Sequence, residues 1–197
     1  MRKLLVVVGF AALWALFVVV SDGSATRTPG DDCHAVGGGG MICRSFEVEA
    51  KGPLDTAIVC ESPAGDFDIF DHFVNNQTRT EWIDENGNLT NRSDHDVISF
   101  GEWSNPLTGA VVPYTQHSVE NDDFPVPGDT STATITFTGE NIYRLPTGKF
   151  VLQAVGRQVY TWDDFDLLSS HGPNAFVAAF YEGDPHAFDQ ICAALGA

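Results

Sequence analysis

Short β-type segments separated by turn residues follow one another along most of this chain, and that pattern leaves few folds open. Residues 132–138 alternate most cleanly, with threonines on one face and Ala133, Ile135 and Phe137 on the other. Asn86-Gly87 is a dipeptide that strongly favours a tight β-hairpin. Residues 105–109, Asn-Pro-Leu-Thr-Gly, have the composition of another turn. Successive strands joined by short turns predict an antiparallel meander.

We expect about eight strands after a short strand-like Phe-Glu-Val-Glu at 46–49. The candidate segments are nine: 57–60, 66–74, 77–84, 94–103, 110–119, 132–138, 142–145, 149–162 and 175–182. A sheet of this size must bury one face and protect its edges, and closing into a barrel does both. We therefore expect an all-β fold closed into a barrel, with a two-sheet sandwich as the alternative.

The last residues change from strand to helix spacing. Asp184 is a suitable N-cap and Pro185 suits the first helical position. Apolar residues then recur at helical intervals: Phe188, Ile191, Cys192 and Leu195. The sequence therefore predicts a short amphipathic C-terminal helix.

The first 25 residues have the pattern of a secretory signal peptide. Arg2 and Lys3 precede an apolar run at 4–20, and Gly23 and Ala25 stand where a signal peptidase reads small residues. The alternative is an uncleaved membrane anchor, since such a run just reaches across a hydrocarbon layer of ~30 Å. The clean cleavage site favours removal, so we predict a secreted, extracellular protein with no membrane attachment after cleavage.

All four cysteines follow the predicted cleavage site. An even number in an oxidising compartment predicts two disulfides, for which three pairings are possible. Cys33 and Cys43 flank the four glycines at 37–40, so a local bridge between them is the simplest, and it leaves Cys60 with Cys192. Zinc binding has less support, because there is no Cys-x-x-Cys. We expect residues 26–53 to form a flexible linker with this small disulfide loop, before a β-barrel domain at 54–197.

Composition narrows the range of partners. Ten Lys and Arg residues against 27 Asp and Glu residues give a net charge of −17. This acidity argues against nucleic-acid binding and against docking on anionic membranes, because both depend on cationic side chains. The chain also lacks a phosphate-binding glycine loop and a Gly-x-Ser-x-Gly elbow. We therefore expect no cofactor.

Residues 66–73 contain the candidate acid–base groups. On a strand, Asp71 lies on one face, and Asp68 and His72 lie on the other. Whichever face lines the core carries a polar group with it, and burial would shift the pKa of that group. Asp71 and His72 are thus the candidate catalytic residues. The alternative, which we favour, is a β-bulge or a solvated face that turns the polar groups outward.

Acidic stretches at 94–96, 120–123 and 163–166 raise the question of a calcium site. None matches the Asp-x-Asp-x-Asp-Gly loop, and the six histidines lack metal-binding spacing. We therefore expect these acids to be solvated and expect no metal.

A glycine in the middle of a strand and several aromatic residues indicate a candidate ligand pocket. Gly156 marks either a bend or a point where a ligand approaches the backbone. Trp82, Trp103, Tyr160 and Trp162 would line such a pocket. The alternative, which we favour, is that the tryptophans simply fill a core.

Several motifs in order resemble a group of small secreted actinobacterial proteins of uncharacterised function. The resemblance rests on the Val-Cys at 59–60, the Asp-Glu-Asn-Gly at 84–87, the segments 105–112 and 139–149, and the Cys-Ala-Ala-Leu at 192–195. It implies secretion, a β-barrel-like core and a Cys60–Cys192 bridge, and it assigns no catalytic residue. The Cys33 and Cys43 segment is not a feature of that group.

Two functional hypotheses follow. The first, which we favour, is a secreted, non-enzymatic, disulfide-stabilised β-barrel that binds a small apolar ligand or an extracellular partner. The alternative is a cyclase- or isomerase-type enzyme in which Asp71 or His72 inside the barrel supplies acid–base catalysis.

Overall fold

The computed structural model describes residues 32–63, 65–145 and 147–196, so the predicted signal peptide at 1–25 lies outside the described residues. The described chain forms one eight-stranded antiparallel sheet with two short helices and a short 3₁₀ turn. The strands are β1 (Asp32–Ala35), β2 (Met41–Cys60), β3 (Phe67–Ile83), β4 (Leu89–Ser104), β5 (Val111–Asp123), β6 (Thr134–Arg144), β7 (Phe150–Thr161) and β8 (Leu167–His171). The 3₁₀ turn is η1 (Thr130–Thr132), and the helices are α2 (Ala175–Phe180) and α3 (Asp189–Leu195).

The predicted all-β antiparallel meander is confirmed, since each strand pairs with the next along the chain. The predicted closure into a barrel is wrong. In the described part of the chain β1 and β8 stand at opposite edges of an open sheet and do not pair. Both are short, with four and five residues, so they offer few backbone groups for closure.

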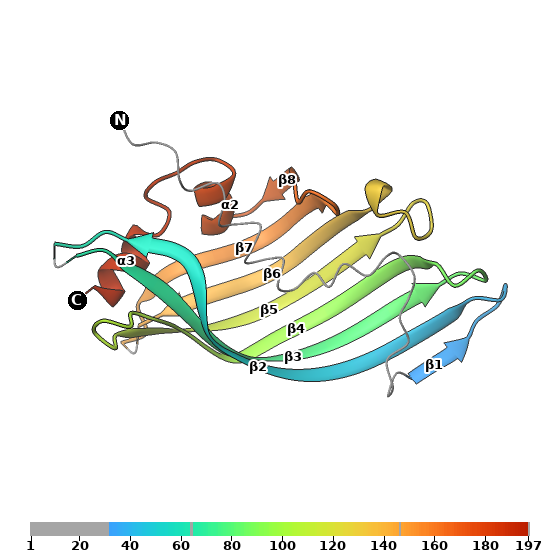
Figure 1. Cartoon of the computed structure of the whole chain (residues 1–197), viewed down its shortest axis with the longest axis horizontal. Coiled ribbons are helices and arrows are strands. Elements are labelled where there is room, and N and C mark those ends of the chain that lie inside the picture. The colour runs from blue at the N-terminus through green and yellow to red at the C-terminus, as the bar shows by residue number, and fades with distance from the viewer. Residues whose placement is uncertain (1–31, 64, 146, 197) are drawn as a thin grey trace.

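Figure 1 shows how the open sheet covers its core. The sheet is strongly curved, and the ends of β2 and β3 that meet near residues 60–67 curl over toward α3. Ile58 and Ile69 from this curled part join one core with Val112 and Tyr143 from the body of the sheet and Ile191 from α3. This layered packing is closer to the sandwich alternative than to a barrel, although the sheet is continuous.

Several predicted strands merge into longer ones. The turn expected at 139–141 lies inside β6, and the segments 66–74 and 77–84 form the single strand β3. The flexible linker expected at 26–53 is wrong over its described part, because residues 32–35 form β1 and residues 41–53 belong to β2. Residues 26–31 lie outside the described residues. Pairing with neighbouring strands holds these segments extended where local composition favours turns.

The C-terminal segment differs from the prediction at one element. The last strand expected, at 175–182, is wrong, because Asn174 caps helix α2 there. Its side-chain Oδ1 accepts hydrogen bonds from the backbone N–H of Phe176 at 3.0 Å and of Val177 at 3.2 Å. The predicted terminal helix is present as α3, starting at Asp189 rather than Asp184.

Two apolar cores lie toward opposite ends of the strands, on the concave face of the sheet. The larger contains α3 and the curled ends of β2 and β3, and the smaller comprises Leu89, Phe124, Ala133, Ile135 and Trp162. Both predicted disulfides are present, with Cys33–Cys43 joining β1 to β2 and Cys60–Cys192 joining β2 to α3. No helix in the described ranges combines the length and apolar character needed to cross a bilayer.

Candidate functional site

Asp71 lies on the concave face of β3, opposite Trp103 of β4 and beside the larger core. The Tyr114 hydroxyl donates to the carboxylate, at 3.1 Å from Oδ1 and 3.2 Å from Oδ2. Burial raises the pKa of Asp71 to about 6, and the Tyr114 hydrogen bond opposes that rise. The nearby indole N–H of Trp103 acts in the same direction as Tyr114, although its geometry falls short of a hydrogen bond. The outward-turning bulge that we favoured is wrong for Asp71, because β3 and β4 pair without interruption from Phe70 to Val74.

His72 lies on the opposite, outer face of the sheet. Its side chain is 48 % exposed, and Nδ1 is 3.7 Å from Glu102 Oε1. Its ring lies edge-on to Phe100, with ring centroids 6.0 Å apart. Since consecutive residues of a strand point to opposite faces, the sheet separates Asp71 from His72. The two candidates therefore do not share one reaction site.

The residues expected to line a ligand pocket are dispersed over the molecule. Trp103 belongs to the larger core and Trp162 to the smaller one. Trp82 lies on the outer face of β3, since its neighbour Ile83 is buried on the concave face. Tyr160 packs among other aromatic rings near β8. Two of the tryptophans thus fill the cores.

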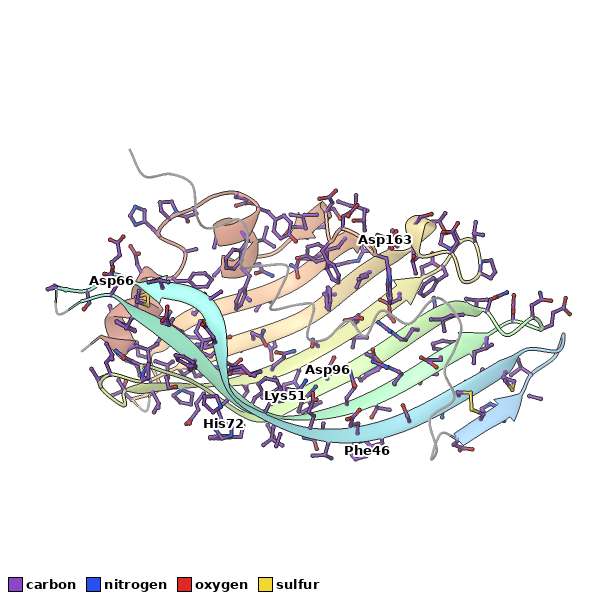
Figure 2. All side chains as sticks on the ribbon, in the orientation of Figure 1. Phe46, Lys51, Asp66, His72, Asp96 and Asp163 are labelled. Atoms are coloured by element: carbon purple, nitrogen blue, oxygen red, sulfur yellow. A yellow bond between two sulfur atoms is a disulfide. The ribbon has the colours of Figure 1, made fainter. Side chains whose placement is uncertain are left out.

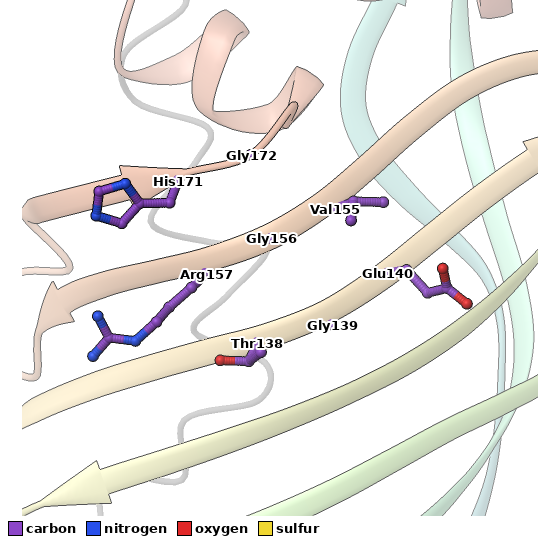
Figure 3. Close-up of a pocket in the computed structure, with 8 residues that line it drawn as sticks. All are labelled: Thr138, Gly139, Glu140, Val155, Gly156, Arg157, His171 and Gly172. Carbon is purple, nitrogen blue, oxygen red and sulfur yellow. The ribbon is translucent and has the colours of Figure 1, made fainter.

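Gly156 lines an open pocket of about 610 Å³ where β6, β7 and β8 approach one another (Figure 3). Five side chains and three glycines surround it: Thr138, Glu140, Val155, Arg157 and His171, with Gly139, Gly156 and Gly172. Gly156 has a φ of +125°, and a Cβ there would overlap the carbonyl oxygen of His171. The glycine therefore permits the close approach of β7 to β8. The pocket is a shallow depression in the surface rather than an enclosed cavity.

An unexpected group of charged residues occupies the middle of the concave face. We call Asp94 and Asp96 of β4 with Glu120 and Asp122 of β5 the carboxylate cluster. Asp94 pairs with Glu120 across the two strands. Asp96 follows Asp94 by two residues on β4, and Asp122 follows Glu120 by two residues on β5, so all four side chains share one face. Asp94 is only 3 % exposed and Asp122 is fully buried. The expectation that these acids are solvated is therefore wrong for Asp94 and Asp122.

Two arginines neutralise part of the carboxylate cluster. Arg92 Nε lies 2.6 Å from Asp122 Oδ2 and 3.4 Å from Asp94 Oδ2, and Arg92 Nη2 donates to Glu120 Oε1 at 2.9 Å. Arg79 donates to both carboxylate oxygens of Asp94, at 2.8 and 3.0 Å. Four carboxyl groups thus face two guanidinium groups, which leaves an excess of acid in a poorly solvated place.

Asp122 responds most strongly to this environment. Burial and the neighbouring Glu120 charge raise the pKa of Asp122 to about 8, while Arg92 opposes the rise. Burial likewise raises the pKa of Glu120. Asp122 Oδ1 has no hydrogen-bond partner in the described part of the chain. The cluster therefore binds a proton more tightly than free carboxylates do. Among the described residues, no group of three or more histidine, cysteine or acidic side chains is arranged to hold a metal ion.

The outer face of β2, β3 and β4 carries exposed apolar side chains. We call Phe46, Val48, Val74, Val97 and Phe100 the outer-face patch. Phe46 is 68 % exposed, Val48 57 % and Phe100 46 %, whereas Val74 and Val97 are half-buried. The register places Val48 and Val97 on either side of Asn76, and pairs Val74 with Phe100. Apolar side chains that gather on a folded surface mark interaction sites.

The strand that carries Phe46 and Val48 also has a free edge. β1 pairs with β2 only from Met41 to Arg44, whereas β3 pairs with β2 continuously from Met41 to Lys51. Within the described chain, residues 45–51 therefore have a strand on one side only. The alternating sequence at 46–49 indicated a strand with Phe46 and Val48 on one face, and it carried no signal for the unpaired edge.

No protein-family model, no curated protein and no solved structure matches this chain. The resemblance to secreted actinobacterial proteins therefore stays a prediction.

Proposed function

We propose that this chain is a secreted, non-enzymatic, disulfide-stabilised binding protein that recognises an extracellular protein through the outer-face patch. The observation that carries the proposal is the exposure of Phe46 and Val48, 68 % and 57 %, on the stretch of β2 that has a described strand on one side only. Exposing such side chains to water is unfavourable, and covering them with a partner recovers the cost. The two disulfides are consistent with an oxidising compartment.

A protein partner fits this geometry better than a small apolar ligand. Of the tryptophans expected to line a pocket, Trp103 and Trp162 lie in separate cores and Trp82 lies on the outer face, and the described pocket at Gly156 is shallow and open. Small-molecule sites usually enclose most of their ligand.

An enzymatic role has one observation in its favour, the raised pKa of Asp71. However, a general acid or base must reach the substrate. Both oxygens of Asp71 instead lie within hydrogen-bonding distance of Tyr114, beside the larger core, and His72 lies across the sheet. We therefore assign Asp71 a structural role.

The proposal is tested with the double variant Phe46→Ser/Val48→Ser. Its control is Leu107→Ser, which removes an apolar side chain that is 74 % exposed on the β4–β5 turn, away from the patch. Each secreted protein is immobilised and incubated with concentrated extracellular proteins from the source culture. We expect the wild type and the control to retain the same partner, and the double variant to retain at least fivefold less. Equal retention by all three proteins would overturn the proposal.

Native mass spectrometry of the secreted protein separates the two kinds of ligand. The proposal predicts the mass of the disulfide-bonded chain without an organic adduct. A stoichiometric organic adduct would instead support small-ligand binding.

A further inference from the structure

We infer that the partner adds a strand to the free edge of β2, through an extended segment in which lysine or arginine alternates with apolar residues. This inference rests on the proposed binding function and names the class of its partner. It follows from the backbone, the outer side chains and the concave side chains of residues 45–51.

Among the described residues, no second strand pairs with the backbone of residues 45–51 on the side away from β3. Alternate residues of a strand direct their N–H and C=O groups to one side, and β3 occupies only one side of residues 45–51. Within the described residues, the free stretch begins beyond Arg44, which pairs with Asp32, and stops at Gly52-Pro53, where the register shifts and proline lacks an N–H. An added strand would have a length of about 23 Å at ~3.3 Å per residue. Unpaired edges of this kind are sites of strand addition.

The outer side of the edge specifies apolar residues in the partner. Phe46 and Val48 point outward at the edge, and Val97 and Phe100 continue the patch behind them on β4. Side chains of an added strand that point outward lie beside Phe46 and Val48. Apolar side chains there cover the patch.

The concave side of the same edge specifies cations. Glu47 and Glu49 point to the concave face, where Glu47 pairs in register with Gln77 and, beyond it, Asp96. Asp96 is labelled on the sheet in Figure 2. Glu49 forms an ion pair with Lys51 at 2.7 Å, whereas no ion pair to Glu47 is found within the described residues. An added strand alternates its two faces in the same way, so its concave-facing positions lie beside carboxylates. Lysine or arginine at these positions matches that charge.

A second copy of this chain fits the edge poorly. Antiparallel pairing of two such edges brings Glu47 and Glu49 close to the same residues of the other copy, and each chain carries a net charge of −17. Like charges placed across a strand pair destabilise it. The partner is therefore a different, cationic segment.

The test uses the full secreted protein and a capped heptapeptide, Lys-Val-Lys-Val-Lys-Val-Lys, measured by calorimetry and hydrogen exchange. Three control peptides separate the contributions: the same peptide with Glu for Lys, a scrambled Lys-Lys-Lys-Lys-Val-Val-Val, and a copy methylated on alternate backbone nitrogens. We expect the alternating peptide to bind at least tenfold more tightly than each control and to slow amide exchange at 45–51. Equal binding of the scrambled or methylated peptide, or unchanged exchange at 45–51, overturns the inference.

A charge variant locates the cations. Glu47→Gln/Glu49→Gln is compared with Glu61→Gln/Glu182→Gln, which removes the same charge at two exposed positions elsewhere. We expect the first variant to raise the dissociation constant of the alternating peptide at least fivefold and the second to raise it less than twofold. Equal effects would contradict the placement of the cations. A homodimer of the free protein, observed by light scattering, would replace the cationic segment with a second copy.

The outcomes distinguish this inference from the proposed function. If Phe46→Ser/Val48→Ser loses the culture partner but the peptide does not slow amide exchange at 45–51, strand addition is ruled out and the binding function stands. Retention of the partner by that variant removes both.

Discussion

Arg92 and Asp122 form an ion pair in the concave face of the sheet, with Arg92 Nε 2.6 Å from Asp122 Oδ2 and the Asp122 side chain fully buried. Arg92 also contacts Glu120 and Asp94, and its guanidinium lies 4.8 Å from the ring centroid of Trp162. The single guanidinium of Arg92 thus contacts three carboxyl groups next to the smaller core. The stability of the protein should therefore depend on the protonation of these groups.

We expect the free energy of unfolding to fall as pH rises from about 4 to about 8. The pKa of Asp122 is about 8 in the folded protein and 3.8 when unperturbed, so in this window the folded state binds more protons than the unfolded state. Each pH unit can cost up to about 1.4 kcal/mol. Thermal unfolding by circular dichroism should show a weaker pH dependence for Asp122→Asn than for the wild type. Asp123→Asn, an exposed neighbour, is the control, and an unchanged slope in Asp122→Asn would count against the assignment.

Arg92→Met should destabilise the protein more than Arg79→Met. Arg92 has three carboxyl partners and a side chain only 14 % exposed, whereas the side chain of Arg79 is 35 % exposed and its ion pair is with Asp94. Removing one partner of a buried ion pair costs about 3–5 kcal/mol, and exposed pairs cost much less. Urea denaturation at pH 7 measures the difference. The loss of unfolding free energy in Arg92→Met should be smaller at pH 5, because protonated carboxyl groups carry no charge for the guanidinium to neutralise. Equal losses for both variants would contradict this prediction.

The Cys60–Cys192 bridge should contribute more stability than the Cys33–Cys43 bridge. It closes a loop of 132 residues, against 10 for the other, and chain entropy then predicts about 5 and about 3 kcal/mol. It also holds α3 against the larger core. Paired Cys→Ser variants, compared by urea denaturation, measure the two contributions, and dithiothreitol should lower the melting temperature of the wild type. A larger loss for the Cys33/Cys43 pair would reverse the prediction.

Gly156→Ala should destabilise the protein by more than about 2 kcal/mol, beyond the usual cost of a positive φ. A Cβ at Gly156 would overlap the carbonyl oxygen of His171, so β7 and β8 would have to separate. Gly148→Ala is a matched control, because its φ is +83° and its Cβ would meet nothing within 4 Å. The difference in melting temperature between the two variants isolates the close approach. Similar melting temperatures would mean that β8 moves aside easily.

Local signals in the sequence determined much of the chain path. The Asn86-Gly87 hairpin connects β3 to β4, where Asp84 Oδ1 accepts from the backbone N–H of Asn86 and of Asn88, both at 2.8 Å. The turn at 105–109 connects β4 to β5, and both predicted disulfide pairings are present. These features depend on nearby residues, on alternation and on loop length, which a sequence displays directly.

Sequence patterns misplaced the polar groups of the candidate sites. Asp94-His95-Asp96 looks like a solvated acidic stretch, yet Asp94 is buried and His95 is exposed. Alternation states which residues share a face, but not which face the rest of the chain covers. Asp94 is tolerated inside because Arg79 and Arg92, on β3 and β4, reach it there.

The sequence by itself determined the order of antiparallel strands, the main turns, the terminal helix and the cysteine pairs, because each follows from short-range backbone preferences or chain length. Only the tertiary structure decided that the sheet stays open and that the carboxylate cluster faces inward. These outcomes depend on contacts between residues far apart in the chain. The bridge from Cys60 to Cys192 and the packing of α3 on the larger core cover the apolar face, so that closing a barrel is no longer required.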